Sequence, residues 1–553
     1  MAWTEPTVAI DTSLPAEGYR LRVGPDGVFL AAADDAGAFY GRATLAQLRR
    51  LHDGALPCCS IEDWPDSPVR GVMIDVSRDK VPTMATLETL VERLASWKIN
   101  QLQLYTEHTF AYADHRDVWA DASPLTAEEV RRLDGFCRDR HVELVPNQNC
   151  LGHMGRWLKH ERYRSLAIKP DGWTQRGRWR PPTTLDPAKP GSLALIRELL
   201  GELLPNFSSR RVHVGLDEPW ELPSERFDEY GDWVNTLRAL PELDGREMLV
   251  WGDILATTPS LLARLPDGVT VCEWGYEDWH PFAERAETLA AGQRPFWVCP
   301  GTSSWMTLLG RVSNMRGNGT AAARAGLEHE AAGFLTTDWG DCGHLQYLPV
   351  SEPGFAHAAA VSWCLEANRD IDLAEALDMH CFDDPARQLG RALLMLGETY
   401  GLVGASVPNT SVLVMHLYWP QIQLGRTFNQ GMTADDLAAV GATLDDAVSK
   451  LAAARPRRSD GDLVIEELAT AAALVAVLCR DARARLAVDG WLGSVPQTTR
   501  DRLAAELEPL IAAHRRLWLA RNRPGGLEDS AAWLVHLREC YLTGTTDRAW
   551  GGW

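Results

Sequence analysis

The amino-acid sequence predicts an α/β protein: a central (β/α)₈ TIM barrel, preceded by a small α+β domain and followed by a helical region. Short β-type runs alternate with amphipathic helices over residues 66–354, and eight such runs in fewer than about 300 residues match the usual size of this barrel. Beyond residue 354 the composition shifts to Ala, Leu, Arg and Glu with helical periodicity. The apolar fraction, 45% of 553 residues, is enough for one large core with satellites.

The N-terminal segment, residues 1–65, predicts the small α+β domain. Residues 19–23 and 28–32 are β-type runs, and residues 38–51, A-F-Y-G-R-A-T-L-A-Q-L-R-R-L, have the apolar spacing of a helix. The turn-rich D-W-P-D-S-P at 63–68 marks the end of this domain.

Polar and aromatic residues gather at the carboxyl ends of the eight central runs, where barrel active sites lie. A helix over 84–96 follows the first run. The expected strands are residues 71–76, 100–105, 142–146, 211–215, 248–251, 269–274, 296–300 and 333–339. A doubly wound sheet is the competing fold, but it usually has a Gly-rich phosphate turn after its first strand, and V-S-R-D-K at 76–80 contains no glycine.

Residues 355–553 form the predicted helical region. Helical periodicity is clear at 435–451 and 501–519, and loops at 455–462 and 522–526 separate the helices. Such a region is typical of a scaffold that packs on the barrel or on a second subunit, so a homo-oligomer stays open.

The charge balance restricts the partners. With 55 basic and 75 acidic residues, the formal charge of −20 excludes nucleic acid and membrane surfaces as partners and favours a neutral sugar or small molecule. The first residues do not resemble a signal peptide, and the longest apolar run, 469–479, is about half a membrane span. The eleven cysteines lack zinc-type spacing. We therefore expect a cytoplasmic protein with reduced thiols and no metal or cofactor.

Two adjacent carboxylates, Asp217 and Glu218, follow the expected strand at 211–215 in R-V-H-V-G-L-D-E-P-W. Neighbouring side chains of a regular strand point to opposite faces, so both can serve one site only where the strand gives way to a loop. Placed there, two carboxylates can differ in pKa and divide acid and base roles between them.

Tryptophan is unusually frequent, with 22 residues. Trp251, Trp274, Trp305 and Trp339 lie at or near the ends of expected strands. Aromatic faces stack on the C–H surfaces of sugars, and indole N–H groups bond hydroxyls, so this placement favours a carbohydrate site.

Six motifs occur in the order seen in glycoside hydrolase family 20, and the sequence resembles that family over residues of about 20 to 345. The motifs are R-G-V-M-I-D-V-S-R (70–78), W-K-I-N-Q-L-Q-L-Y (97–105), L-G-H (151–153), H-V-G-L-D-E (213–218), V-W-G-D (250–253) and T-D-W-G-D (337–341). The family contains the β-N-acetylhexosaminidases. The resemblance implies an enzyme that removes terminal β-linked N-acetylhexosamine, either GlcNAc or GalNAc.

The resemblance also implies catalytic roles. Asp217 would orient the substrate's 2-acetamido group, whose oxygen attacks C1 to give an oxazolinium ion, and Glu218 would protonate the glycosidic oxygen. His153 would relay between Glu218 and an acid after the second strand, for which Glu107 is the best candidate.

Substrate binding is implied for a further set of residues. Arg70 would grip ring hydroxyls, and Asp341 would accept hydrogen bonds from the far edge of the sugar. The remaining substrate-binding residues are Trp251, Trp305 and Trp339, which would form an aromatic box around the acetamido methyl group, and His213.

The sequence departs from the family pattern at several positions, which indicates a divergent member. Leu216 stands where the motif has its second glycine, and Met306 stands where a tyrosine is expected to bond the acetamido carbonyl. The segments P-N-Q-N-C (146–150) and L-Y-T-E-H (104–108) also differ from the family.

Two alternatives stay open. In the first, Glu273 is a nucleophile opposite Glu218, an arrangement that needs carboxyl groups about 5–5.5 Å apart. In the second, the chain is a non-catalytic glycan-binding protein on the same scaffold. The retained carboxylate pair favours an enzyme, because a pure binder gains little from burying it.

Overall fold

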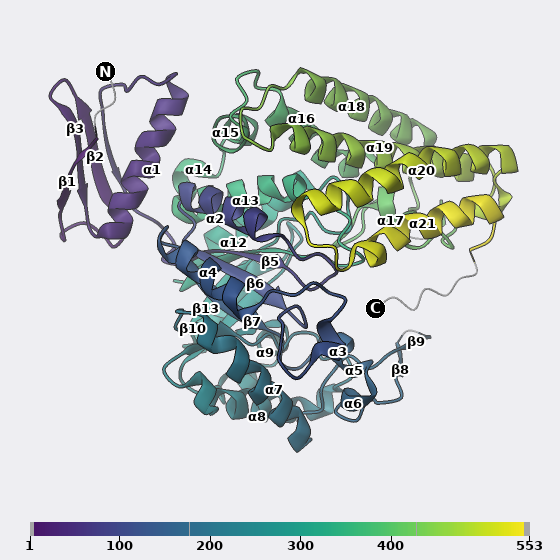
Figure 1. The fold of residues 1–553 in the computed structure, drawn as a ribbon, viewed down its shortest axis with the longest axis horizontal. Coiled ribbons are helices and arrows are strands. Elements are labelled where there is room, and N and C mark those ends of the chain that lie inside the picture. The colour runs from purple at the N-terminus through teal and green to yellow at the C-terminus, as the bar shows by residue number, and fades with distance from the viewer. Residues whose placement is uncertain (1–4, 176, 427–428, 547–553) are drawn as a thin grey trace.

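The computed structural model describes residues 5–175, 177–426 and 429–546, so the outer limits of the predicted domains, residues 1 and 553, lie outside the described residues. Figure 1 shows three parts: a small N-terminal sheet with one helix, a central barrel, and a layer of long helices formed by the C-terminal part of the chain.

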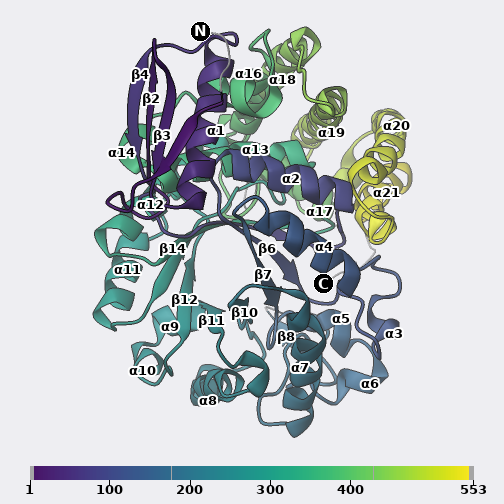
Figure 2. The same ribbon diagram turned by 60° about the vertical axis from the view of Figure 1, so that its left-hand side comes forward.

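The central domain is a closed barrel of parallel strands in the order β10-β11-β12-β13-β14-β5-β6-β7. Figure 2 shows these strands around a common centre with helices outside them. The strands are β5 (Arg70–Asp75), β6 (Gln101–Thr106), β7 (Glu143–Gln148), β10 (Arg211–His213), β11 (Glu247–Trp251), β12 (Val269–Trp274), β13 (Phe296–Cys299) and β14 (Gly333–Asp338). All eight predicted strands are confirmed, because strands covered on both faces read as continuous apolar runs.

Helices cover the outside of the barrel. Each of two early helices begins at a capping threonine: Thr83 accepts a hydrogen bond from the Thr86 N–H, and Thr126 forms a capping box with Glu129. The longer barrel helices are α2 (Met84–Ser96), α4 (Ala127–Arg138), α7 (Pro190–Leu203), α8 (Phe227–Arg238), α11 (Phe282–Ala291), α12 (Val312–Glu328) and α13 (Leu348–Trp363). Helix α13 packs on β14 and β5, so the last barrel helix runs across the boundary predicted at 354–355.

Short elements fill the βα loops at the carboxyl ends of the strands. A small hairpin projects after the third barrel strand. These elements are α3 (Arg116–Trp119), α5 (Gly155–Leu158), α6 (Glu161–Arg164), β8 (Trp173–Gln175), β9 (Arg178–Arg180), α9 (Asp253–Thr257) and α10 (Pro259–Leu262).

The N-terminal domain is a four-stranded sheet of order β1-β3-β2-β4 that packs against α1 (Asp35–Leu51). Its strands are β1 (Thr7–Ile10), β2 (Tyr19–Gly24), β3 (Gly27–Ala32) and β4 (Cys59–Asp63). Strands β2 and β3 alternate between buried and less buried residues, which is why the sequence predicts them. Strand β1 has no buried residue and therefore gives no such pattern.

The C-terminal region is helical, as predicted, and the loops at 455–462 and 522–526 connect its long helices. Its helices are α14 (Leu365–Asn368), α15 (Leu373–Leu377), α16 (Leu389–Glu398), α17 (Val412–Tyr418), α18 (Ala434–Ala453), α19 (Gly461–Leu486), α20 (Gln497–Arg521) and α21 (Leu527–Thr543). Within the described ranges, no helix combines the length and the apolar character needed to cross a membrane.

The turn between α20 and α21 is bonded to the loop after β5. The Thr83 N–H donates to the Arg521 carbonyl (2.9 Å), and the Arg523 N–H donates to the Val81 carbonyl (2.8 Å). Gly526 lies so close to Asp79 that a Cβ there would overlap the Asp79 carbonyl. The helical region therefore supports a loop at the carboxyl end of the barrel.

Candidate active site

The loop after β10 carries the paired carboxylates. The strand ends at His213, and two of the residues that follow, Gly215 and Leu216, adopt positive φ angles of 71° and 77°. This turn releases Asp217 and Glu218 from strand geometry at the carboxyl end of the barrel. Leu216 is fully buried, so its side chain packs in the core despite a backbone conformation that favours glycine.

Asp217 is buried and surrounded by donors. Asn149 Nδ2 donates to its Oδ1 (2.8 Å), and His153 Nε2 lies 3.2 Å from its Oδ2. Burial alone would raise the pKa of Asp217, but His153, Arg78 and Asn149 outweigh it and lower the pKa below its ordinary value. Asp217 is therefore an anion at neutral pH.

His153 joins the two carboxylates. Its Nε2 lies 3.5 Å from Glu218 Oε2, and its Nδ1 lies 3.3 Å from Arg78 Nη2. Burial acts to lower the pKa of His153, but Asp217 and Glu218 raise it well above its usual range against the opposing charge of Arg78. His153 therefore lies next to Glu218, and its role as a relay stays a prediction.

Glu107 reaches this group through an arginine. Its Oε1 lies 3.3 Å from Arg78 Nε and accepts a hydrogen bond from the Tyr105 hydroxyl (3.1 Å). The predicted direct contact with His153 is wrong, because the guanidinium of Arg78 extends between the two side chains and contacts both.

Arg70 lies at the opposite end of the barrel. It begins β5, its side chain is fully buried, and its Nη1 lies 2.7 Å from Glu17 Oε2 of the N-terminal domain. The prediction that it binds substrate is therefore wrong. The second arginine of the same motif, Arg78, follows the carboxyl end of the strand and lies 3.0 Å from Asp75 Oδ2 (Nη1) and 4.7 Å from the ring centre of Tyr105.

Asp341 lies in the loop after β14. Burial raises its pKa to about 6; Arg78 opposes this shift, while Asp75 and Glu218 add to it. Arg78 and Glu218 are therefore among the charges that act on Asp341. Its contact with a sugar stays a prediction.

The three predicted box tryptophans belong to one aromatic cluster at the centre of the barrel. The ring centres of Trp251 and Trp339 are 5.9 Å apart, and Trp339 Nε1 donates to the Tyr276 hydroxyl (2.8 Å). Tyr276 in turn packs edge-on against Trp305 at 5.0 Å. None of the three tryptophans is more than 7% exposed, so their contact with a ligand stays a prediction.

His213 packs against the aromatic cluster. It has no exposed surface, its ring centre lies 4.2 Å from that of Trp251, and its Nδ1 accepts the Gly215 N–H (3.0 Å). Burial lowers its pKa to about 3, so the imidazole is neutral. The predicted direct substrate contact is wrong, because the ring is covered by Trp251 and its own loop.

Two further residues escape the sequence analysis. Tyr276 supplies a hydroxyl beside Trp305, next to the position where Met306 replaces the expected tyrosine. Asp253, in V-W-G-D, accepts the Glu218 N–H on Oδ2 (3.0 Å). Burial, followed by repulsion from Asp217, raises the pKa of Asp253 to about 7. The V-W-G-D motif could have indicated Asp253 as a candidate site residue, whereas no feature of the sequence around Tyr276 indicates a functional role.

A cavity of about 320 Å³ opens beside this group, between the loops after β11 and β12. Its wall includes Asp253, Glu273, Trp274, Tyr276 and the largely exposed Trp279. Glu273 is buried, and its Oε1 lies 3.2 Å from His280 Nε2. The cavity thus combines carboxylates with aromatic faces, which suits a polyhydroxylated ligand.

This protein has a closed parallel barrel, with carboxylates and an aromatic cluster at the carboxyl ends of its strands. It therefore belongs to the class of (β/α)₈-barrel proteins with a site at the strand ends. Two models of one family match within that class: "Glycosyl hydrolase family 20, domain 2" over residues 4–64 and "Glycosyl hydrolase family 20, catalytic domain" over residues 68–294. The chain belongs to glycoside hydrolase family 20.

Similar proteins carry related names. A β-hexosaminidase from Akkermansia muciniphila is 30% identical over 234 residues, which are 38% of this chain and 47% of that protein. A lacto-N-biosidase from Bifidobacterium bifidum is 22% identical over 285 residues, 46% of this chain and 24% of that protein. The chain thus matches less than half the length of these relatives.

Solved structures share the fold. An exo-β-N-acetylglucosaminidase from Vibrio harveyi has a TM-score of 0.54 at 18% identity. The match covers 70% of this chain and 68% of the Vibrio harveyi chain. A β-N-acetylhexosaminidase from Streptomyces coelicolor has a TM-score of 0.52 at 21% identity, with coverages of 73% and 86%. At these identities the likeness concerns the fold.

Proposed function

We propose that this protein hydrolyses terminal β-linked N-acetylhexosamine, GlcNAc or GalNAc, with the substrate's own acetamido group as nucleophile. The observation that carries the proposal is the pairing of an ionised, buried Asp217 with the more exposed Glu218, whose side chain is 32% exposed and within 3.5 Å of His153. Family membership and the names of the relatives support it.

The two carboxylates have different tasks in this proposal. Asp217 accepts the acetamido N–H and balances the positive charge that develops as the acetamido oxygen attacks C1. Its lowered pKa keeps it charged, and Asn149 and His153 fix its orientation. Glu218 donates its proton to the departing oxygen and afterwards accepts one from water.

Arg78 and the aromatic cluster complete the proposed site. Arg78 Nε lies 3.3 Å from Glu107 Oε1, and the charge of Arg78 also acts on Asp341, so these groups are proposed to bind the hydroxyls of the sugar. The Tyr276 hydroxyl is proposed to donate a hydrogen bond to the acetamido carbonyl, in place of the tyrosine that Met306 replaces.

All eleven cysteines are free thiols, which supports a proposed cytoplasmic location.

The test compares aryl β-glycosides with and without the 2-acetamido group. We expect the GlcNAc or GalNAc glycoside to react orders of magnitude faster than the plain glucoside or galactoside, and Asp217→Asn to remove most of that difference. Glu218→Gln should slow a GlcNAc disaccharide by about 10²–10⁴-fold. A cyclic thiazoline, which mimics the oxazolinium ion, should bind much more tightly than substrate.

The alternatives give different results in the same assay. Equal rates on both kinds of substrate, with activity lost in Glu273→Gln, would favour Glu273 as a nucleophile; this carboxylate lines the same cavity as Asp253. Glycan binding without turnover of any glycoside would favour the non-catalytic protein.

A further inference from the structure

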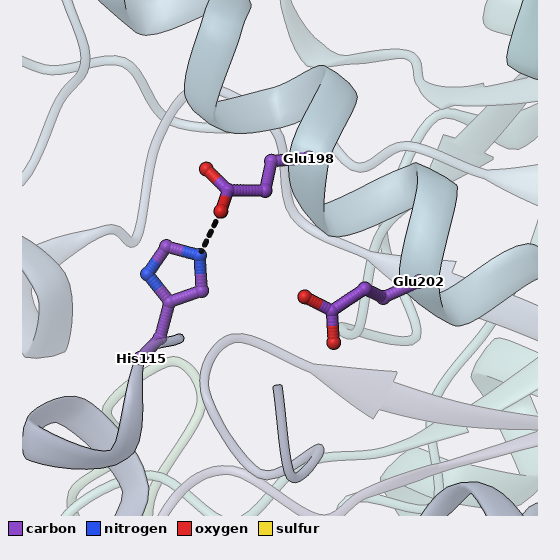
Figure 3. Close-up of side chains that lie close together, drawn as sticks. All are labelled: His115, Glu198 and Glu202. Carbon is purple, nitrogen blue, oxygen red and sulfur yellow. Dashed lines mark ion pairs between the residues drawn. The ribbon is translucent and has the colours of Figure 1, made fainter. Parts of the chain in front are cut away.

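A second polar cluster lies outside the proposed active site, between the loop after β6 and helix α7. Figure 3 shows its three side chains, His115, Glu198 and Glu202, turned toward one another. One potential ligand atom from each lies within 4.8 Å of the others. The two glutamates are one helical turn apart on α7, so both side chains leave the same face of the helix.

His115 presents an unsatisfied nitrogen to these carboxylates. Its side chain is 1% exposed, and Nε2 is buried without a hydrogen bond, although it lies 3.3 Å from Glu198 Oε1. Its other nitrogen, Nδ1, lies 2.6 Å from the Tyr163 hydroxyl. If Nδ1–H donates to Tyr163, the lone pair of Nε2 faces two carboxylates, an arrangement of three acceptors without a donor.

We propose that His115, Glu198 and Glu202 bind a divalent cation of the zinc type. Imidazole nitrogens and carboxylate oxygens both bind zinc, and the second nitrogen of a metal-bound histidine usually donates to an oxygen, as Nδ1 can to Tyr163. Ligands bonded to zinc at their usual lengths are about 3.3 Å apart in a tetrahedron, which matches the His115–Glu198 separation of 3.3 Å.

The surroundings favour a cation over an ion pair. Among the residues that the structure describes, no Lys or Arg forms an ion pair with Glu198 or Glu202. Glu202 already accepts the Ala113 N–H (2.8 Å), which fixes its carboxylate beside the loop. Glu198 is 43% exposed, so an ion and its remaining water ligands can enter from solvent.

A bound cation would fasten a loop that supports the proposed active site. The ring of His115 packs against Trp157 with centres 5.2 Å apart, and Trp157 Nε1 donates to the carbonyl of Glu107 (2.6 Å). The cation would therefore tie α7 to the segment that positions Glu107. His115 is far in sequence from Glu198 and Glu202, and the two glutamates alone do not indicate a metal site, which is why the sequence predicts no metal.

The experiment measures zinc binding directly on the tag-free full chain. All proteins carry Cys58→Ser and Cys59→Ser, because these two thiols are adjacent in sequence and accessible to solvent, so together they could compete for zinc. After removal of metal with a chelator, ZnCl₂ is titrated by calorimetry, and bound zinc is counted by elemental analysis after gel filtration. We expect one zinc per chain with an affinity in the micromolar range or tighter.

Variants identify the site. Glu198→Gln and Glu202→Gln change partly exposed side chains and should fold normally, yet each should weaken zinc binding at least about tenfold. Glu161→Gln, on the exposed surface of neighbouring α6, is the matched control and should bind as the parent does. Zinc should also raise the melting temperature of the parent but not of the two ligand variants.

Two results would overturn the proposal. In one, the parent takes up no zinc at millimolar concentration, which would make His115 and Glu198 a simple ion pair. In the other, Glu198→Gln and Glu202→Gln bind zinc as tightly as the control does. Neither result depends on glycosidase activity, so the proposal stands or falls separately from the proposed function.

Discussion

Arg78 contacts three charged or titratable side chains of the candidate site: Asp75, Glu107 and His153. We expect Arg78→Ala to lose charge-assisted hydrogen bonds worth roughly 1.5–3 kcal/mol, or about 10- to 150-fold in kcat/KM. Glu17→Gln, which removes the partner of Arg70, should lower the melting temperature and leave kcat/KM unchanged. Kinetics and thermal unfolding of both variants check this, and a reversed pattern would restore Arg70 as the substrate-binding residue.

Asp253 makes stability depend on pH in an unusual direction. Its pKa in the folded protein is about 7, above its ordinary value of 3.8, so its stabilising contribution is complete below about 3.8 and is lost as pH rises through 7. Asp253→Asn keeps an oxygen for the Glu218 N–H. We expect this variant to be more stable than the parent by about 1–3 kcal/mol at pH 8, with the difference shrinking toward pH 4. Denaturant titrations at the two pH values measure it; a constant difference would contradict the shift.

At the scale of elements, the loops after β7 and β10 are held together by a glycine. A Cβ on Gly152 would overlap the carbonyl oxygen of Asp217, so Gly152→Ala must push the two loops apart. Displacing the proposed catalytic residues Asp217 and Glu218 from His153 by about 1 Å should reduce kcat/KM by about 10²-fold.

The matched control for Gly152→Ala is Gly135→Ala in helix α4. The nearest atom to a Cβ there is Arg138 Nη2 at 3.9 Å, so the side chain fits. Alanine in a helix should stabilise by about 0.5–1 kcal/mol without changing activity. If Gly152→Ala keeps the activity of this control, the two loops do not need their close approach.

The elements also show what the sequence can and cannot predict. Strands buried on both faces are visible as apolar runs, so all eight barrel strands are predictable, whereas the exposed β1 is not. Adjacent residues such as Asp217 and Glu218 share a loop whatever the fold. The two arginines of one motif differ only in which end of β5 they occupy, and only the fold assigns Arg78 to the site. Tyr276 acquires its place through packing against a distant tryptophan.

At the scale of the whole molecule, Glu352 joins the barrel to the helical region. It is fully buried on α13, pairs with Arg93 of α2, and lies 3.1 Å from Arg458 in the loop before α19. Burial would raise the pKa of Glu352, but the two arginines lower it below 4.5. Its contribution to stability is therefore present above about pH 4.5 and is lost as pH falls through the lower folded pKa.

We expect Glu352→Gln to reduce the free energy of unfolding at pH 7 by about 3–5 kcal/mol, because two buried guanidinium groups lose their counter-charge. The deficit should shrink as the pH falls below 4. Calorimetry of both proteins across this range measures it, with the exposed Glu366→Gln as the control that should match the parent. Equal melting temperatures at pH 7 would mean that the network contributes no net stability.

The backbone bonds between the α20–α21 turn and the loop after β5 bear on how this protein can evolve or be re-engineered. Residues 521–523 are bonded to residues 81 and 83, only a few positions beyond Arg78. A barrel excised after Asp341, or grafted onto another C-terminal partner, would retain the carboxylates, Arg78 and the tryptophans of the candidate site but lose the support of the loop that carries Arg78. Recombination that preserves the site must therefore exchange the barrel together with helices α20 and α21, so that the two parts are inherited as one unit.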